Sequence, residues 1–317
     1  AKLDLHVYEV PVRYYGRSYA EGKKITWKDG VAAFRHIVHF SLSRKKFVRD
    51  VAAIHNVMVS PPPQTDVGVD TLEVFESARR YNAWICERIE SAIGERVLEV
   101  GSGIGNIVSE LLARETVRLV VATDLNASSL ATLRDRFGND ERLATEVWNA
   151  EDPPSEGLLR EKFDTIICSN VLEHIEDHER AAAHMRQLLK PGGRLVILVP
   201  ANPSIYSGLD EDLGHFRRYT KAELTRVLEV AGCKVESVID HNLLGAIGWW
   251  WAGKVKGRRT LRAKDTKTFD KLVPLLKPVD RYLTKFFGGV SVIAVSTNGS
   301  EAAGNLTGDA SPGARMA

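Results

Sequence analysis

A glycine-rich segment that follows a short hydrophobic run carries the clearest chemical signal in the sequence. Glu99 lies near the end of the run and is followed by Gly101, Gly103 and Gly105. Glycines permit positive φ angles and let a ligand approach the backbone, and a helix that begins there offers unpaired N–H groups. The dinucleotide fingerprint requires glycine at position 106, which is asparagine here, and no Gly-Lys-Ser/Thr follows as in a P-loop. The spacing therefore predicts a nucleotide-type ligand site of another kind.

A second carboxylate supports this site. Asp124 stands 25 residues after Glu99, at the end of the next hydrophobic run. A carboxylate at the carboxyl end of a neighbouring parallel strand can accept hydrogen bonds from both hydroxyls of a ribose. The alternative is that Asp124 only caps the helix expected over 127–137.

The elements that must position these residues follow an alternating pattern. Helical patterns separate the early hydrophobic runs, beginning with a helix predicted over 71–92, which indicates right-handed βαβ units. We predict an α/β fold with a Rossmann-like, doubly wound, mostly parallel seven-stranded sheet and helices on both faces. The predicted strands are 96–100, 118–123, 143–148, 163–169, 194–199, 234–240 and 290–297.

These motifs resemble the class I S-adenosylmethionine-dependent methyltransferases over roughly residues 71–297. The segments 163–176 and 188–198 resemble the family's fourth and fifth motifs, and Asn149-Ala150 stands where the third usually has Asp-Ala. The resemblance implies S-adenosyl-L-methionine as the cofactor, with the acidic residue and glycines of the first motif around its methionine end and the acid after strand two on the ribose. The implied cofactor-binding residues are Glu99, Gly101, Gly103, Gly105, Asp124, Leu125, Asn149, Ala150 and Asn170.

Two histidines and a tyrosine are the candidate catalytic residues. Methyl transfer depends mainly on alignment, so a base is needed only when the acceptor must lose a proton. His174, which follows strand four, is either such a base or a residue that packs on the cofactor. Its neighbour Glu173 is interpreted as an acid at a helix start. His215 and Tyr219 lie in the segment 214–220, which resembles the lid over the acceptor pocket in this family and is called the lid segment.

The same segment contains two arginines and a helix start. Arg217 and Arg218 suit an anionic or phosphate-bearing acceptor. Thr220 and Glu223 have the spacing of a capping box, which predicts a helix over 221–231. This prediction does not depend on the role of the two arginines.

Bulk composition is that of an ordinary globular protein, with 44% hydrophobic and 26% charged residues in 317. The three cysteines, Cys86, Cys168 and Cys233, show no CxxC spacing, so neither a metal site nor a disulfide is predicted. No signal peptide and no apolar run of about 18 residues is present. These features predict a cytoplasmic protein, with oligomeric state left open.

The first 70 residues differ from the rest. Residues 7–40 resemble the C-terminal tail of family-two glycosyltransferases of the polyprenyl-phosphate type, through Tyr8-Glu-Val-Pro-Val-Arg-Tyr-Tyr-Gly-Arg17 and Glu21–Gly30. No nucleotide-sugar domain precedes residues 7–40 in this sequence, so we expect this segment to be the remnant of a glycosyltransferase–methyltransferase fusion. The predicted organisation is a basic segment (1–55), a proline-rich linker (56–70), the methyltransferase domain (71–297) and a disordered tail (298–317).

Residues 241–289 form a basic, tryptophan-rich insertion between the last two predicted strands. They carry 11 Lys and Arg against 3 Asp and Glu, and residues 1–55 carry 11 against 5. Trp249-Trp250-Trp251 followed by basic residues up to 262 indicates peripheral membrane contact at the cytoplasmic face, or alternatively a pocket wall. The insertion is expected to serve acceptor access rather than the cofactor. Nucleic acid is disfavoured because the aromatic residues are clustered and the body of the chain is acidic.

The expected function is methyl transfer to a small-molecule, glycan or lipid-linked acceptor. A nicotinamide-dependent oxidoreductase, disfavoured by Asn106, and a membrane-associated interaction module on a methyltransferase scaffold are the alternatives.

Overall fold

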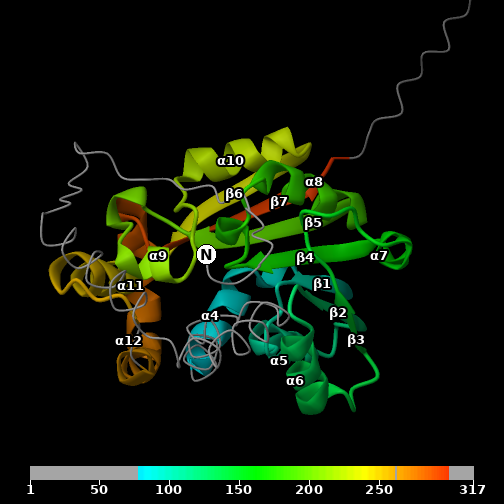
Figure 1. The fold of residues 1–317 in the computed structure, drawn as a ribbon, viewed down its shortest axis with the longest axis horizontal. Coiled ribbons are helices and arrows are strands. Elements are labelled where there is room, and N and C mark those ends of the chain that lie inside the picture. The colour runs from blue at the N-terminus through cyan, green and yellow to red at the C-terminus, as the bar shows by residue number, and fades with distance from the viewer. Residues whose placement is uncertain (1–77, 261–262, 300–317) are drawn as a thin grey trace, which may run out of the picture. The chain divides into compact units, whose positions relative to one another are not determined.

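The computed structural model describes residues 78–260 and 263–299, and they form an α/β structure (Figure 1). Seven strands make one sheet in the order β3-β2-β1-β4-β5-β7-β6. Strand β7 is antiparallel to both of its neighbours, and the remaining pairs are parallel. The strands are β1 (Arg96–Val100), β2 (Leu119–Asp124), β3 (Leu143–Val147), β4 (Phe163–Ser169), β5 (Leu189–Pro200), β6 (Cys233–His241) and β7 (Ser291–Asn298). The predicted mostly parallel, seven-stranded sheet is confirmed.

Helices cover both faces of the sheet, as Figure 1 shows. One face packs against α7 (Glu156–Glu161), α8 (His178–Leu188) and α10 (Lys221–Val230), and the other against α4 (Arg79–Arg88), α5 (Asn106–Leu112) and α6 (Ala127–Phe137). Successive side chains of a strand point to opposite faces. Accordingly Leu98 and Val100 join the first core and Val97 joins the second. Burial of both faces explains why the central strands β1, β2 and β4 are largely hydrophobic, whereas the outer strands β3 and β6 are partly exposed and more polar.

The element boundaries differ from the sequence predictions by small amounts. Strand β5 begins five residues before the predicted Arg194. The predicted first helix appears as α4 followed by a 3-10 turn, Glu90–Ala92. Asn298, placed in the tail by the sequence, ends β7. The glycosyltransferase-like segment, the linker, positions 71–77 and residues 300–317 lie outside the described residues.

The insertion between β6 and β7 is helical. It comprises α11 (Leu243–Trp250), a π-helical turn (Trp251–Val255) and α12 (Ala263–Phe287). Two buried carboxylates of α12 hold the insertion in place, one by a bond to the domain and the other by bonds to the start of α11. Asp270 accepts a hydrogen bond from the Tyr81 N–H of α4, and Asp280 accepts bonds from the backbone N–H groups that precede and begin α11. No helix within the described residues has the length and apolarity needed to cross a membrane.

Candidate active site

The predicted glycine loop joins the end of β1 to α5, at the point where the strand order reverses between β1 and β4. Ligands of open α/β sheets bind at this carboxyl edge. Gly101, Gly103 and Gly105 have φ angles of 72°, 52° and 89°. A Cβ atom on Gly101 would collide with the side chain of Val171, and one on Gly105 would lie 2.9 Å from the ring of Phe137. Glycine is therefore needed here for both conformation and space.

Glu99 is a buried acid beside this loop. It is 3% exposed, and its Oε2 atom has no hydrogen-bond partner among the described residues. Burial, with a smaller contribution from Asp124, raises its pKa to about 8. A buried carboxyl group with an unused oxygen fits a ligand that brings a cationic ammonium group.

Asp124 closes the loop from the neighbouring strand. Its Oδ2 accepts the Gly103 N–H at 2.8 Å, and its Oδ1 accepts the Asn126 N–H at 2.8 Å. A carboxylate has about four acceptor positions, so two remain for ribose hydroxyls. The alternative role of helix cap belongs to Asn126, whose side chain accepts the Ser128 N–H. Leu125 is 70% exposed beside Asp124 and is free to pack on a ligand.

The other predicted cofactor residues follow the adjacent strands. Asn149 comes after β3, and its side chain accepts the Glu151 N–H at 3.1 Å. Ala150 is buried, with its carbonyl oxygen 2.9 Å from the His184 ring. Asn170 follows β4 with a φ of 53°, and its N–H donates to the Leu198 carbonyl. The structure thus brings the predicted cofactor residues to one edge of the sheet.

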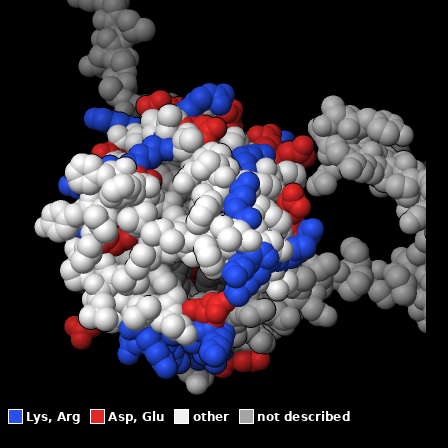
Figure 2. Space-filling view, turned by 90° about the vertical axis from the view of Figure 1, so that its left-hand side faces the viewer, with Lys and Arg blue, Asp and Glu red and all other residues white. Residues whose placement is uncertain are grey.

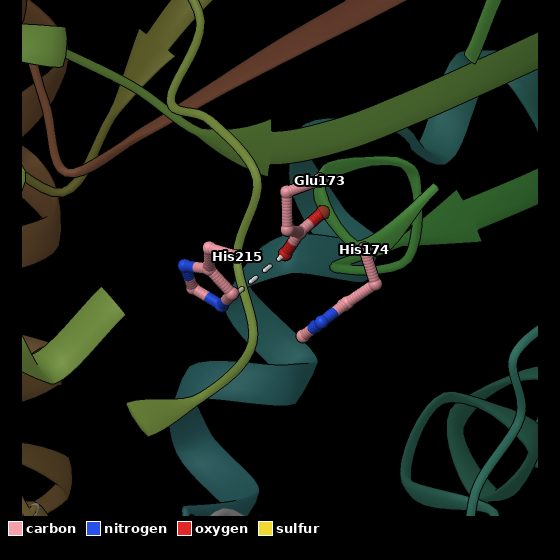
Figure 3. A group of neighbouring side chains, drawn as sticks. All are labelled: Glu173, His174 and His215. Carbon is pink, nitrogen blue, oxygen red and sulfur yellow. Dashed lines mark ion pairs between the residues drawn. The ribbon is translucent and has the colours of Figure 1, made fainter. Parts of the chain in front are cut away.

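A second group of side chains lies after β4, beside the glycine loop, because Val171 contacts Gly101. Glu173 and His174 belong to the 3-10 helix η3 (Leu172–His174), and His215 approaches them from the lid segment (Figure 3). The His215 Nε2 atom is 4.0 Å from Glu173 Oε1, and the rings of His174 and His215 meet edge to face at 4.8 Å. The two candidate histidines therefore do come together.

Glu173 is more than the helix-start acid that the sequence suggested. It is fully buried, and neither carboxylate oxygen has a hydrogen-bond partner among the described residues. Burial raises its pKa to about 8, although the residue's own backbone N–H and the charge of Arg218 act in the opposite direction. Such a group costs folding free energy unless something binds it.

Asp210 organises this region, although it is not among the residues predicted from the sequence. It lies in α9 (Gly208–Asp212), and its carboxylate contacts His215 Nδ1 at 3.0 Å, Arg218 Nε at 2.7 Å and Trp249 Nε1 at 3.1 Å. These donors hold its pKa below the usual range, against the effect of burial. Asp210 also completes a capping box with Ser207, and the Ser-x-x-Asp spacing was the only local signal for it.

The lid residues have roles that differ from those expected. Arg218 is buried against Asp210 and stacks on Trp249, so it does not present a free charge to an acceptor. Arg217 donates to the carbonyl groups of Ile175 and Glu176. These two arginines fasten the lid to the domain.

Tyr219 is likewise committed to the core. It is 1% exposed, its hydroxyl donates to the Leu172 carbonyl, and it lies 2.8 Å from His178 Nδ1. This geometry supports a positioning role for Tyr219 instead of the acceptor contact that its place in the lid suggested. The predicted capping box between Thr220 and Glu223 is confirmed at the start of α10.

The doubly wound sheet, the glycine loop and the two acids define a methyltransferase-type nucleotide site. Residues 74–238 match the model of a family described as a methyltransferase domain, and the chain belongs to that family. Its members use S-adenosylmethionine as the methyl donor. The orphaned Glu99 oxygen and the glycine loop fit that cofactor.

Sequence relatives include parts of much larger enzymes. The polyketide synthase component of lovastatin nonaketide synthase from Aspergillus terreus is 29% identical over 206 residues, 64% of this chain and 6% of that protein. Methyltransferase GfsG of Streptomyces halstedii is 30% identical over 125 residues, 38% of this chain and 44% of that protein. The match thus spans less than half of either relative.

Among solved structures, a Haloferax volcanii methyltransferase in complex with the Trm112 methyltransferase activator has a TM-score of 0.55. It is 15% identical, and the match covers 76% of this chain and 100% of that one. This likeness shows the fold alone.

Proposed function

We propose that this chain transfers a methyl group from S-adenosylmethionine to a small-molecule acceptor whose reacting atom must lose a proton. The observation that carries the proposal is the convergence of Glu173, His174 and His215 after β4, beside the glycine loop. The match to polyketide synthases and to a free-standing methyltransferase supports a small-molecule acceptor. The family match gives no support to the nicotinamide-dependent alternative.

The cofactor supplies an electrophilic methyl group, and the residues of the chain supply alignment. Glu99 would hold the cationic end of the cofactor through its unused oxygen, and Asp124 would accept hydrogen bonds from the ribose hydroxyls. Positioning of this kind lowers a barrier by roughly 7–11 kcal/mol when donor and acceptor are held in a near-attack pose.

The second group of residues, Glu173, His174 and His215, acts on the acceptor. The Asp210 carboxylate holds His215 through Nδ1, so that Nε2 points toward Glu173. A ring fixed in this way presents one defined nitrogen to an acceptor hydroxyl or acidic carbon. His174 is exposed whereas Glu173 is fully buried, so we propose that an acceptor approaches from the side of His174.

We further propose that the acceptor is reached from an anionic membrane surface. Large apolar side chains are exposed on α11, the π-helical turn and α12, among them Ile247, Trp250, Trp251, Leu275, Val279, Tyr282, Phe286 and Phe287. Figure 2 shows uncharged side chains over much of this side of the molecule, with Lys and Arg at its border. Aromatic and basic residues in combination favour a lipid interface. This surface suits an acceptor with a lipid-like portion.

The test is transfer of radiolabelled methyl from S-adenosylmethionine into lipid and small-molecule fractions of the source cell. We expect label in one fraction, and a loss of about 10²-fold or more in His215→Asn. Arg180→Gln, a substitution of an exposed residue in α8, is the control that keeps the activity. Cofactor binding with no labelled product in any fraction contradicts the proposal and favours the scaffold alternative.

A further inference from the structure

We propose that Glu173, His174 and His215 bind a divalent transition-metal ion. The proposal rests on the proposed function only for the role of the ion, because the site itself is defined by geometry. One ligand atom from each of the three residues lies within 4.8 Å of the others. Two imidazoles and one carboxylate are a common donor set for zinc, iron and related ions.

The state of Glu173 is the first argument. The side chain is 0% exposed, and both of its oxygens lack a hydrogen-bond partner among the described residues. A proton on one oxygen would remove the charge but would leave the hydroxyl and the carbonyl unpartnered. Since buried polar groups are almost always satisfied, a ligand bound directly to the carboxylate accounts for this arrangement.

The orientation of His215 is the second argument. Its Nδ1 is engaged by Asp210 at 3.0 Å, which leaves Nε2 directed at Glu173, 4.0 Å from Oε1 (Figure 3). A carboxylate that fixes one ring nitrogen while the other faces a metal is the usual outer arrangement of metal-bound histidine. Asp210 is itself neutralised by Arg218. Arg218 is therefore committed to Asp210, and a cation that displaces the proton of Glu173 would pair with the resulting carboxylate.

The third argument is access. Glu173 is buried and His215 is 9% exposed, whereas His174 is exposed at the rim. The site is thus open on one side, which leaves coordination positions for water or an acceptor oxygen. Ligands about 2.0–2.2 Å from a zinc ion lie roughly 3.3 Å apart, so side-chain shifts of about 1 Å would close the three residues around the ion.

The ion explains how the acceptor is activated. A bound dication lowers the pKa of an acceptor hydroxyl, which loses its proton to water. The acceptor oxygen then forms a bond to the methyl carbon as the sulfur–carbon bond breaks, and S-adenosylhomocysteine leaves. No metal site was predicted from the sequence, because the prediction considered cysteine spacing. The ligands proposed here are not cysteines, and they come from segments about 40 residues apart.

The test is calorimetric titration of the metal-stripped full chain with Zn²⁺ and with Co²⁺, whose visible absorption gives a second readout. We expect one ion per chain. Glu173→Gln and His215→Ala should weaken binding more than about 100-fold, beyond the 10–100-fold cost of losing an outer partner. His174→Ala, at an exposed position, tests the same site if either buried variant fails to fold. Glu179→Gln and His184→Ala are matched controls in α8 that keep the affinity.

The outcomes separate this inference from the proposed function. No binding by the wild-type chain, or equal binding by the ligand variants, overturns the metal site. Methyl transfer that persists at full rate in metal-stripped protein also overturns the role of the ion and leaves His215 as a direct proton acceptor. Metal binding without methyl transfer to any acceptor would retain the site and contradict the function.

Discussion

Glu99 gives the site a dependence on pH. Its pKa rises from 4.5 to about 8 in the fold. The folded state therefore holds the proton more tightly than the unfolded chain, and the free energy of unfolding falls as pH rises from 4.5 through 8. A cationic ligand group that pairs with the ionised Glu99 carboxylate would offset this loss of stability.

We predict that affinity for S-adenosylmethionine increases between pH 6 and pH 8 in wild type and is weaker and much flatter in Glu99→Gln. Without ligand, Glu99→Gln should be more stable than wild type at pH 8.5, because no buried charge forms at this position. Calorimetry and urea unfolding at pH 6, 7 and 8.5 measure both quantities. Wild-type affinity that does not change over this range would remove Glu99 from the cofactor site.

Asp124 is the second residue whose role is measurable. Asp124→Ala should weaken S-adenosylmethionine binding by about 1–3 kcal/mol, because ribose hydroxyls lose a charged acceptor. Asp135→Ala, which removes an exposed carboxylate of α6, is the matched control. An affinity within twofold of wild type in folded Asp124→Ala protein would contradict the ribose assignment.

Residues next to a strand end could be predicted from the sequence, whereas the residue that organises the lid could not. Glu99 and Asp124 are marked by local patterns, a hydrophobic run and a turn. Asp210 acquires its role from Arg218 and from Trp249, which is 39 positions away. No periodicity or spacing reports a contact of that length. The same limit explains why Arg218 was expected to face an acceptor.

At the scale of elements, the turn between β1 and α5 depends on backbone conformation. Gly103 has a φ of 52°, and its N–H holds Asp124. We predict that Gly103→Val abolishes cofactor binding without unfolding the domain, because a β-branched side chain resists positive φ and intrudes on the ligand. Gly192→Val is the control, since Gly192 also has a positive φ and no atom lies within 4 Å of a Cβ atom added there. If both variants bind the cofactor equally, the loop is not its site.

The packing of β6 against α4 buries a histidine side chain that has no hydrogen-bond partner among the described residues. His241 is 0% exposed, contacts the rings of Trp84 and Tyr81, and has no hydrogen-bond partner for either nitrogen among the described residues. Burial, with the charge of Arg88, lowers its pKa to about 3. The unfolded chain therefore takes up a proton first, and stability is lost as pH falls from 6.5 toward 3.

We predict that His241→Phe reduces this acid sensitivity. Between pH 6.5 and pH 4 the wild type should lose about 1.4 kcal/mol per pH unit through this residue, and the variant should lack that contribution. Urea unfolding at pH 7.5, 5.5 and 4.5 gives the comparison. If the free energy of unfolding changes equally with pH in the two proteins, His241 is either charged or hydrogen-bonded in solution.

The central strands were predictable because they are buried on both faces, whereas β3 and β6 are partly exposed. The observed strand ends shift by only a few residues. The insertion was predictable as a region but not as a structure. Asp270 and Asp280 fix its helices through bonds to the backbone of α4 and the start of α11. Its composition indicated basic and aromatic character, and only the fold separates Trp249 from the two tryptophans that follow it.

At the scale of the whole molecule, charge and apolar surface occur together on the insertion. Residues 241–289 carry 11 Lys and Arg against 3 Asp and Glu. Trp250 and Trp251 are 46% and 50% exposed, whereas Trp249 donates to Asp210. The insertion therefore has an outer surface suited to lipid and one residue that reaches the lid. A triple alanine substitution of the tryptophans would disturb both.

We predict that the chain sediments with anionic vesicles and not with neutral ones, and that added salt weakens this binding, since each Lys or Arg near an anionic leaflet contributes about 1 kcal/mol. Trp250→Ala with Trp251→Ala, and separately Lys254→Glu with Lys256→Glu, should each reduce sedimentation. Val230→Ala, an exposed apolar residue of α10, should not. All of these variants should keep their affinity for S-adenosylmethionine, because Glu99 and Asp124 lie at the opposite half of the strand order. Sedimentation that is negligible for wild type on both vesicle types would contradict membrane contact and leave the apolar helices as a wall of the acceptor pocket.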